Sequence, residues 1–201
     1  MTSEPTITDA SAPAEQPLRS RFLDAGMRVL ARDGYVGFKQ ATVCAETGLT
    51  TGAFYHSFRN WKEFEQALIG HWRDEATDRI VARLDTEPPS AERIAALIEV
   101  ALSLPHRAEA AIRAWAAVDE RVAGALTEVD AVRRGAVARY IGELGVDQTH
   151  AGHLAGMSML LLIGHETAGT PIADLEWSMR HVIETDPPIQ AAFAALDQTP
   201  E

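Results

Sequence analysis

The sequence predicts an all-α protein. Apolar residues recur at helical spacing in one segment after another, and no stretch shows the alternation of a β-strand. Capping residues begin these segments, and Gly or Pro ends them. Charge is unevenly distributed along the chain. The whole chain has a net charge of −11, but residues 18–62 are basic because they contain seven Lys and Arg and only three Asp and Glu. A basic segment on an acidic body is compatible with nucleic-acid binding, because attraction to phosphate is local.

The N-terminal quarter is expected to hold a tail and three helices. Residues 1–17 mix Thr, Ser, Pro, Ala and Glu without periodicity, so we expect them to be disordered. A first helix is expected over 18–33, ended by Gly34 in a left-handed conformation. Two short helices are expected to follow, over 39–47 and 51–57.

The remaining chain is expected to form longer helices. Asn60 and Glu63 make a capping box, and an apolar line from Phe64 to Leu84 follows it. The next helices are expected over about 90–103, where Ser90 can cap the first turn, and near 106–117. A long helical stretch follows and is ended by Gly145. The last helices are expected from Asp147 to about 168, from Asp174 to about 184, and in a short segment after Pro187-Pro188. The helix after Asp147 is apolar on more than one face, so it must be covered on both sides.

Residues 42–58 have the features of a helix-turn-helix. Cys44 is small enough for a close helix crossing, and Gly48 can adopt the positive φ that the turn requires. Thr50 or Thr51 can cap the second helix, whose N-terminal residues would then face base edges in a major groove. The apolar anchors of the two helices are Val43, Leu49, Phe54 and Phe58.

Two runs in this region carry a resemblance to a known family. Residues 48–58 read Gly-Leu-Thr-Thr-Gly-Ala-Phe-Tyr-His-Ser-Phe, and residues 31–35 read Ala-Arg-Asp-Gly-Tyr. They resemble the DNA-binding domain of the tetracycline-repressor (TetR) family, and the match covers about 18–68. The resemblance implies a three-helix DNA-binding domain over 18–62. A long helix would join it to an effector-binding and dimerisation domain over 63–201.

The resemblance also implies DNA-contacting residues. Tyr55 matches the family tyrosine that contacts a phosphate, and Lys39 stands where a capping, phosphate-contacting Thr is common. Ser57 replaces the usual His, beside His56, and Trp61 replaces a common phosphate-binding Lys, beside Lys62. The DNA-contacting residues predicted in this way are Lys39, Thr50, Thr51, Ala53, Tyr55, His56 and Lys62.

For the second domain, the resemblance implies a ligand pocket after residue 90 and pairing of the last two long helices with a second copy. We nominate four large or adaptable side chains as ligand contacts: Trp72, Trp115, Met157 and His165. Residues of these types are more often ordinary core residues than ligand contacts, so the core interpretation stays open for each of them.

Catalytic, metal and cofactor sites are not expected. His165-Glu166 begins like a zinc-protease helix, but the position four residues after His165 is Gly169. Cys44 is the only cysteine and belongs to the helix crossing, which fits a reducing cytoplasm. The longest stretch without charge or His, Leu154 to Gly164, is far shorter than the roughly 18 residues of a membrane span. We therefore expect a cytoplasmic protein that is neither an enzyme nor bound to membranes.

The predicted function is a ligand-responsive transcriptional repressor. It would bind a palindromic operator in double-stranded DNA as a homodimer and respond to a small-molecule effector. Two alternatives stay open. One is an activator of the same fold, and the other is a helical small-molecule-binding protein or enzyme without DNA binding.

Overall fold

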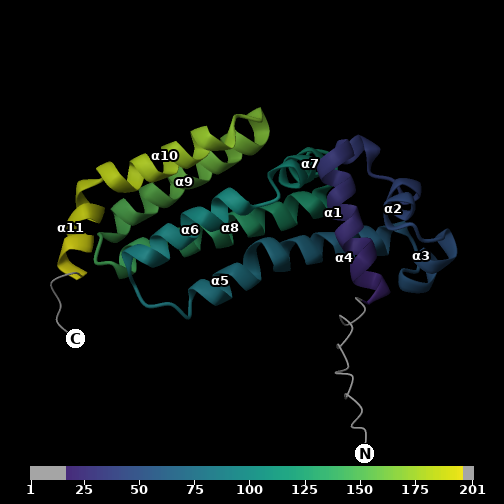
Figure 1. The fold of residues 1–201 in the computed structure, drawn as a ribbon, viewed down its shortest axis with the longest axis horizontal. Coiled ribbons are helices and arrows are strands. Elements are labelled where there is room, and N and C mark those ends of the chain that lie inside the picture. Colours follow the sequence, from purple (N-terminus) through teal and green to yellow (C-terminus); the bar gives the residue numbers. More distant parts are fainter. Residues whose placement is uncertain (1–16, 197–201) are drawn as a thin grey trace, which may run out of the picture.

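The computed structural model describes residues 17–196, and this part of the chain consists of helices and short connections without a strand (Figure 1). The predicted all-α class is thereby confirmed. The tail expected over 1–17 lies, apart from Pro17, outside the described residues. In chain order the elements are α1 (Leu18–Gly37), α2 (Gln40–Thr47), α3 (Thr51–Ser57), α4 (Trp61–Arg73), the π-helical turn η1 (Asp74–Asp78), α5 (Arg79–Leu84), α6 (Ala91–Ser103), α7 (His106–Ala116), α8 (Glu120–Glu143), α9 (Gln148–Ala168), α10 (Ile172–Thr185) and α11 (Pro187–Leu196).

Three of the predicted helix starts are confirmed here by side-chain caps. Asn60 Oδ1 accepts a hydrogen bond from the backbone N–H of Glu63 at 2.9 Å. Ser90 Oγ accepts one from the N–H of Arg93 at 3.1 Å. Asp147 Oδ1 accepts two, at 2.9 and 3.1 Å. Each cap satisfies N–H groups that have no partner within their own helix.

Two expected helix ends differ from the structure. Asp174 does not cap α10, because the helix already begins at Ile172 after Pro171. Asp174 lies instead in the first turn, where the helix dipole stabilises its carboxylate. Gly34 has the predicted positive φ of 66°, but helical turns resume beyond this kink and continue to Gly37.

We call residues 18–68 the head; they form a small domain around an aromatic core. The rings of Phe54 and Phe58 lie 5.3 and 5.0 Å from that of Phe64. Gly26 lets α1 approach α4 closely, because a Cβ there would lie 2.9 Å from Phe64 Cζ and 3.0 Å from Leu68 Cδ1. The aromatic core holds α3 at the tip of the head, at one end of the molecule (Figure 1).

We call residues 69–196 the body, and α4, η1 and α5 together form a connecting rod (residues 61–84) that enters it. The predicted apolar line of the rod is largely buried, including Phe64, Trp72 and Leu84. The long helices α6, α8, α9 and α10 lie along the body, and α11 lies at its far end (Figure 1). α1 packs against α7, where Tyr35 stacks on Trp115 with ring centroids 5.3 Å apart. The hydrophobic core therefore continues from the head into the body without a break at residue 62.

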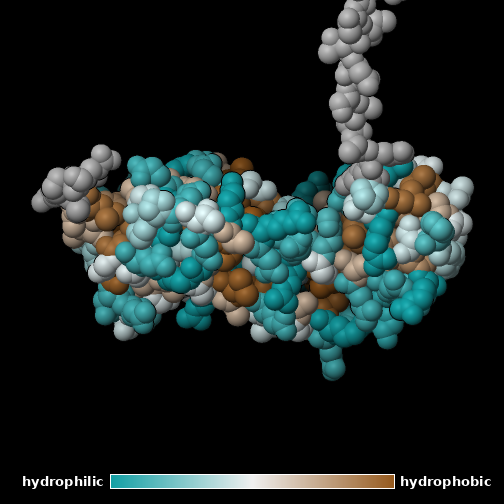
Figure 2. All heavy atoms as spheres, turned by 90° about the horizontal axis from the view of Figure 1, so that it is seen from below, coloured by the Kyte–Doolittle hydropathy of each residue, from teal (hydrophilic) through white to brown (hydrophobic). Residues whose placement is uncertain are grey.

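The surface is mixed in polarity. Figure 2 shows one face of the molecule, on which hydrophobic side chains form separate patches among hydrophilic ones. Within residues 17–196, no helix is both long enough and apolar enough to cross a membrane.

Candidate nucleic-acid interface and ligand cavity

The turn between α2 and α3 has the predicted helix-turn-helix geometry. Gly48 adopts the left-handed conformation (φ 66°, ψ 17°), which ends α2 without steric cost. Thr50 Oγ1 accepts a hydrogen bond from the N–H of Ala53 at 3.2 Å, so Thr50 rather than Thr51 is the cap of α3. Cys44 is buried between the helices, and burial raises the pKa of its thiol. A buried thiol with a raised pKa is unreactive, so its role is structural.

α3 buries one face and exposes the other. Phe54 and Phe58 are buried in the head core, whereas Thr50, Thr51 and His56 are exposed and Ala53 is half-buried. Tyr55 is 54% exposed. Its hydroxyl donates only a long hydrogen bond, 3.5 Å, to Gln40 Oε1. Such a bond is weak, so the hydroxyl can turn to another acceptor at little cost.

Ion pairs offset part of the positive charge on the surface of the head. Arg28 and Arg32 both pair with Glu46. Arg59 pairs with Glu63 at 2.8 Å. These exposed pairs are worth little in stability, but they neutralise charge.

Two lysines of the head keep their charge. Lys39 precedes α2 and Lys62 lies in the first turn of α4; both are exposed, and neither has an ion-pair partner among residues 17–196. They lie at the ends of the two helices that flank the predicted recognition helix. The head therefore presents α3 together with unpaired positive charge on its surface.

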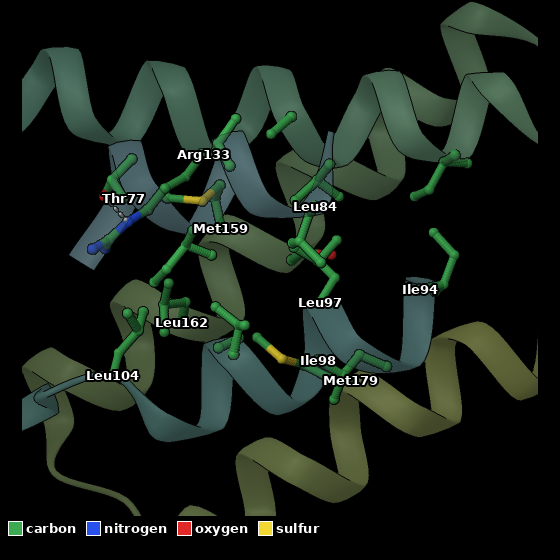
Figure 3. Close-up of a pocket in the computed structure, with 18 of the residues that line it drawn as sticks. Thr77, Leu84, Ile94, Leu97, Ile98, Leu104, Arg133, Met159, Leu162 and Met179 are labelled. Atoms are coloured by element: carbon green, nitrogen blue, oxygen red, sulfur yellow. Dashed lines mark hydrogen bonds between the residues drawn. The ribbon is translucent and has the colours of Figure 1, made fainter. Parts of the chain in front are cut away.

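The body contains an apolar cavity that sequence reasoning did not locate (Figure 3). It has about 820 Å³ of empty space between its lining atoms, including its open mouth. Its walls come from η1, α5, α6, α8, α9 and α10. The lining residues are Ala76, Thr77, Ile80, Val81, Leu84, Ile94, Leu97, Ile98, Val100, Ala101, Leu104, Arg133, Ala136, Val137, Ile141, Ser158, Met159, Leu162, Met179 and Ile183.

None of the four nominated ligand residues lines this cavity. Trp72 and Trp115 are each 1% exposed and fill the core. Met157 is 39% exposed on the outer face of α9. His165 lies in a separate groove between α1, α7 and α9, where its Nδ1 is 3.1 Å from Thr170 Oγ1. The structure therefore does not bring the four together in one site.

A buried polar network borders the cavity. Arg133 donates to both carboxylate oxygens of Glu109, at 2.8 and 3.1 Å, and through Nε to Thr77 Oγ1 at 3.0 Å. Its Nη2 also donates to the carbonyl of Ala76 at 3.1 Å. Trp72 Nε1 donates to Glu109 Oε1 at 2.8 Å. The network thus joins the connecting rod to α7 and α8. A sequence signal for it exists, because Arg133 interrupts the apolar stripe of α8.

A second buried carboxylate lies nearby, on α9. Glu166 accepts from Arg113 Nε at 2.7 Å, whereas its Oε1 has no hydrogen-bond partner within the described residues. Burial, with a contribution from the negative charge of Glu109, raises the pKa of Glu166 to about 7. His106 Nδ1 lies 3.8 Å from Glu166 Oε1, and burial lowers the pKa of His106.

These groups do not form a metal site. Among residues 17–196, no group of three or more His, Cys, Asp or Glu side chains could hold a metal ion. His150, near the start of α9, pairs with Asp186 at 2.8 Å.

No protein-family model matches the chain, and no curated protein matches its sequence. Solved structures do match its fold. A transcriptional regulator of Saccharomonospora viridis in complex with choline has a TM-score of 0.69 and 20% identity, over 84% of this chain and 96% of that one. A TetR-family transcriptional regulator of a Rhodococcus species has a TM-score of 0.65 and 17% identity, over 89% and 100%. The chain has the fold of the TetR-family regulators.

The TetR fold accounts for the arrangement described above, with a helix-turn-helix at one end and a helical body behind it. The fold is also found in a Bacillus subtilis regulator in complex with stearoyl-CoA, with a TM-score of 0.51 and 14% identity over 89% of this chain and 95% of that one. The ligands of the two complexes, choline and stearoyl-CoA, differ widely in size and charge. The fold alone therefore says little about which ligand a given chain binds.

Proposed function

We propose that the protein is a TetR-family transcriptional repressor that binds a palindromic operator as a homodimer and releases it when a small molecule binds. The observation that carries this proposal is the recognition helix: α3 is anchored by Phe54 and Phe58 and leaves Tyr55 exposed at the tip of the head. A helix held in this way can enter a major groove, with its N-terminal residues at the base edges.

The DNA contacts divide into two kinds. Thr50, Thr51 and Ala53 lie in the first turn of α3 or at its cap and would meet bases or backbone. Tyr55, His56, Lys39 and Lys62 would contact phosphates. The two lysines supply positive charge that no ion pair among the described residues offsets, whereas Arg28 and Arg32 pair with Glu46 and Arg59 pairs with Glu63.

A homodimer is supported by the outer face of α9 and α10. Leu160 is 73% exposed and Trp177 is 65% exposed, an unusual situation for large apolar side chains. Gly164, one helical turn after Leu160 on α9, is also exposed and adds no bulk there. A second copy related by a two-fold axis would cover this face and place two α3 helices for the two halves of a palindrome.

The apolar cavity is the proposed effector site. Its wall includes η1 and α5, which continue directly into α4 and the head. A ligand that favours one position of the connecting rod would change the separation of the two heads in the dimer. DNA and ligand would then weaken each other's binding by the same factor.

The first experiment measures DNA binding by the full chain. Fluorescence anisotropy with the DNA upstream of its own gene should give a discrete complex at low salt. Lys39→Ala and Lys62→Ala should each make the slope of log affinity against log salt shallower by about 0.9, because each removes a phosphate contact. Arg83→Ala, an exposed cation on the far part of the rod, is the matched control and should leave the slope unchanged.

Tyr55→Phe removes only the hydroxyl and should weaken binding to all DNA sequences alike. Absence of any complex at low salt would refute the regulator proposal and favour the helical binding protein without DNA binding. Transcription in vitro from the same upstream DNA then separates repressor from activator, since a repressor lowers transcript yield.

A further inference from the structure

Two of the three polar side chains that line the cavity, those of Thr77 and Arg133, lie together at one end. Figure 3 shows Thr77 and Arg133 at this end and Ile94 at the other. The walls between them are mainly aliphatic, and Met159 and Met179 add flexible thioethers that adapt to different shapes. A ligand in this space loses most of its contact with water, so most of its length must be apolar.

The positive charge of Arg133 is already balanced. Its guanidinium makes a two-fold hydrogen-bonded pair with Glu109, whose side chain is fully buried. An anionic group brought to Arg133 would lie close to the Glu109 carboxylate in a medium of low dielectric constant, where like charges repel strongly. The cavity therefore disfavours an anion, although it contains an arginine.

A cation would find no partner in the cavity either. None of the described residues that line it is acidic, and none is aromatic. Glu109 lies behind Arg133 and is engaged by both Arg133 and Trp72. Burying an ammonium group without a carboxylate or an aromatic ring is costly.

One hydroxyl remains to select among neutral ligands. Thr77 Oγ1 accepts from Arg133 Nε at 3.0 Å, and no other hydrogen bond to this hydroxyl is found within residues 17–196. A hydroxyl that already accepts can still donate its own hydrogen. The other hydroxyl in the wall, that of Ser158, donates to the carbonyl of Leu154 at 3.0 Å.

We propose that the ligand of this cavity is an uncharged, largely hydrocarbon molecule with one neutral acceptor oxygen, such as a ketone, ester or lactone carbonyl. The Thr77 hydroxyl donates to this oxygen, and the hydrocarbon part extends toward Ile94. The proposal rests on the proposed function only in naming the ligand as the effector, because the preference itself is a property of the cavity and is measurable without DNA.

The test compares three ten-carbon compounds by calorimetric titration of the full chain near neutral pH: decan-2-one, decanoate and decylammonium. Decan-2-one should bind at least about tenfold more tightly than either ion, because only the ions must bury a charge without a free partner. Equal or tighter binding of decanoate or of decylammonium would overturn the proposal, and so would a failure of decan-2-one to bind.

Variants locate the binding. Thr77→Val keeps the shape and removes the hydroxyl, so it should weaken decan-2-one about five- to tenfold, whereas Thr77→Ser should retain most of the affinity. Ile98→Trp fills the cavity and should abolish binding. Val118→Ala, at an exposed position between α7 and α8, is the control and should change nothing.

Equal affinity in the Val and Ser variants at position 77 would refute the role of the hydroxyl, and unchanged binding in Ile98→Trp would refute the location. Neither result depends on the anisotropy measurement of DNA binding. If the protein does not bind DNA but binds decan-2-one as expected, the regulator proposal is refuted and the proposed ligand class is still supported.

Discussion

Replacing Arg133 by Met should destabilise the protein far more than removing any surface ion pair. Arg133 is 9% exposed and Glu109 is fully buried, so the substitution leaves a carboxylate without its cation in the interior. Breaking a buried pair in this way typically costs about 3–5 kcal/mol in the free energy of unfolding. The change also leaves the Ala76 carbonyl and the Thr77 hydroxyl without their donor.

The matched control lies on the same helix. Arg139 pairs with Asp85 at 2.7 Å, but both side chains are about two-fifths exposed, at 43% and 40%. Arg139→Met should therefore cost no more than about 1 kcal/mol, because water screens and replaces the pair. Urea unfolding at one fixed protein concentration measures both variants, since dimerisation would make the midpoint depend on concentration.

A double variant separates the pair from the packing. Arg133→Met with Glu109→Gln removes the uncompensated charge, while the carbonyl oxygen of the new amide can still accept from Trp72 Nε1. It should be less destabilised than Arg133→Met alone, by about 1–3 kcal/mol. If the single variant costs no more than Arg139→Met, or if the Glu109→Gln change further destabilises it, the reasoning about the buried pair is refuted.

Two further predictions concern stability. Because the folded protein raises the pKa of Glu166 from 4.5 to about 7, it holds this proton more tightly than the unfolded chain does. The stabilisation that Glu166 contributes to the free energy of unfolding is therefore fully present below about pH 4.5. It decreases by on the order of 2–3 kcal/mol between about pH 4.5 and pH 7. Urea unfolding from about pH 5 to pH 8 should show this decline in the wild type and not in Glu166→Gln, and parallel curves would contradict it. Gly26→Ala should cost about 1–3 kcal/mol in thermal unfolding because its Cβ would meet Phe64 at 2.9 Å, whereas Gly124→Ala, with nothing within 4 Å, should be neutral or stabilising. Equal melting temperatures for the two variants would be evidence against the close approach of α1 and α4.

The head could be predicted from sequence because its signals are local. The cap at Thr50 and the positive φ of Gly48 are each dictated by a few neighbouring residues, and both are present. The net charge of the head was a less reliable guide. The count over 18–62 leaves out Glu63, which pairs with Arg59 at 2.8 Å and lies 3.6 Å from Arg19, so this surface has less free positive charge than the count indicates.

The cavity could not be predicted in the same way, because six elements distant in sequence build its wall. Large side chains are nominated as ligand contacts from the sequence. Trp72 and Trp115 are instead packed on all sides in the hydrophobic core, because side chains of this size fill the space between helices. A cavity is left where medium-sized aliphatic residues fail to meet. Arg133 was the detectable sign, since a charged residue within an apolar helical stripe requires a buried partner.

The π-helical turn is the part of the connecting rod where the number of residues can change with little effect on the direction of the head. A π turn contains one residue more than an α-helical turn but sweeps nearly the same angle, so deleting a residue within Asp74–Asp78 would restore ordinary α geometry with little rotation of the head. The same deletion within α4 or α5 would rotate the head by roughly 100° about the rod axis. The extra residue stays in place because Arg133 on α8 holds the Ala76 carbonyl and the Thr77 hydroxyl. A single-codon deletion at this turn would thus leave the direction of α3 nearly unchanged, whereas the same deletion elsewhere in the rod would alter it.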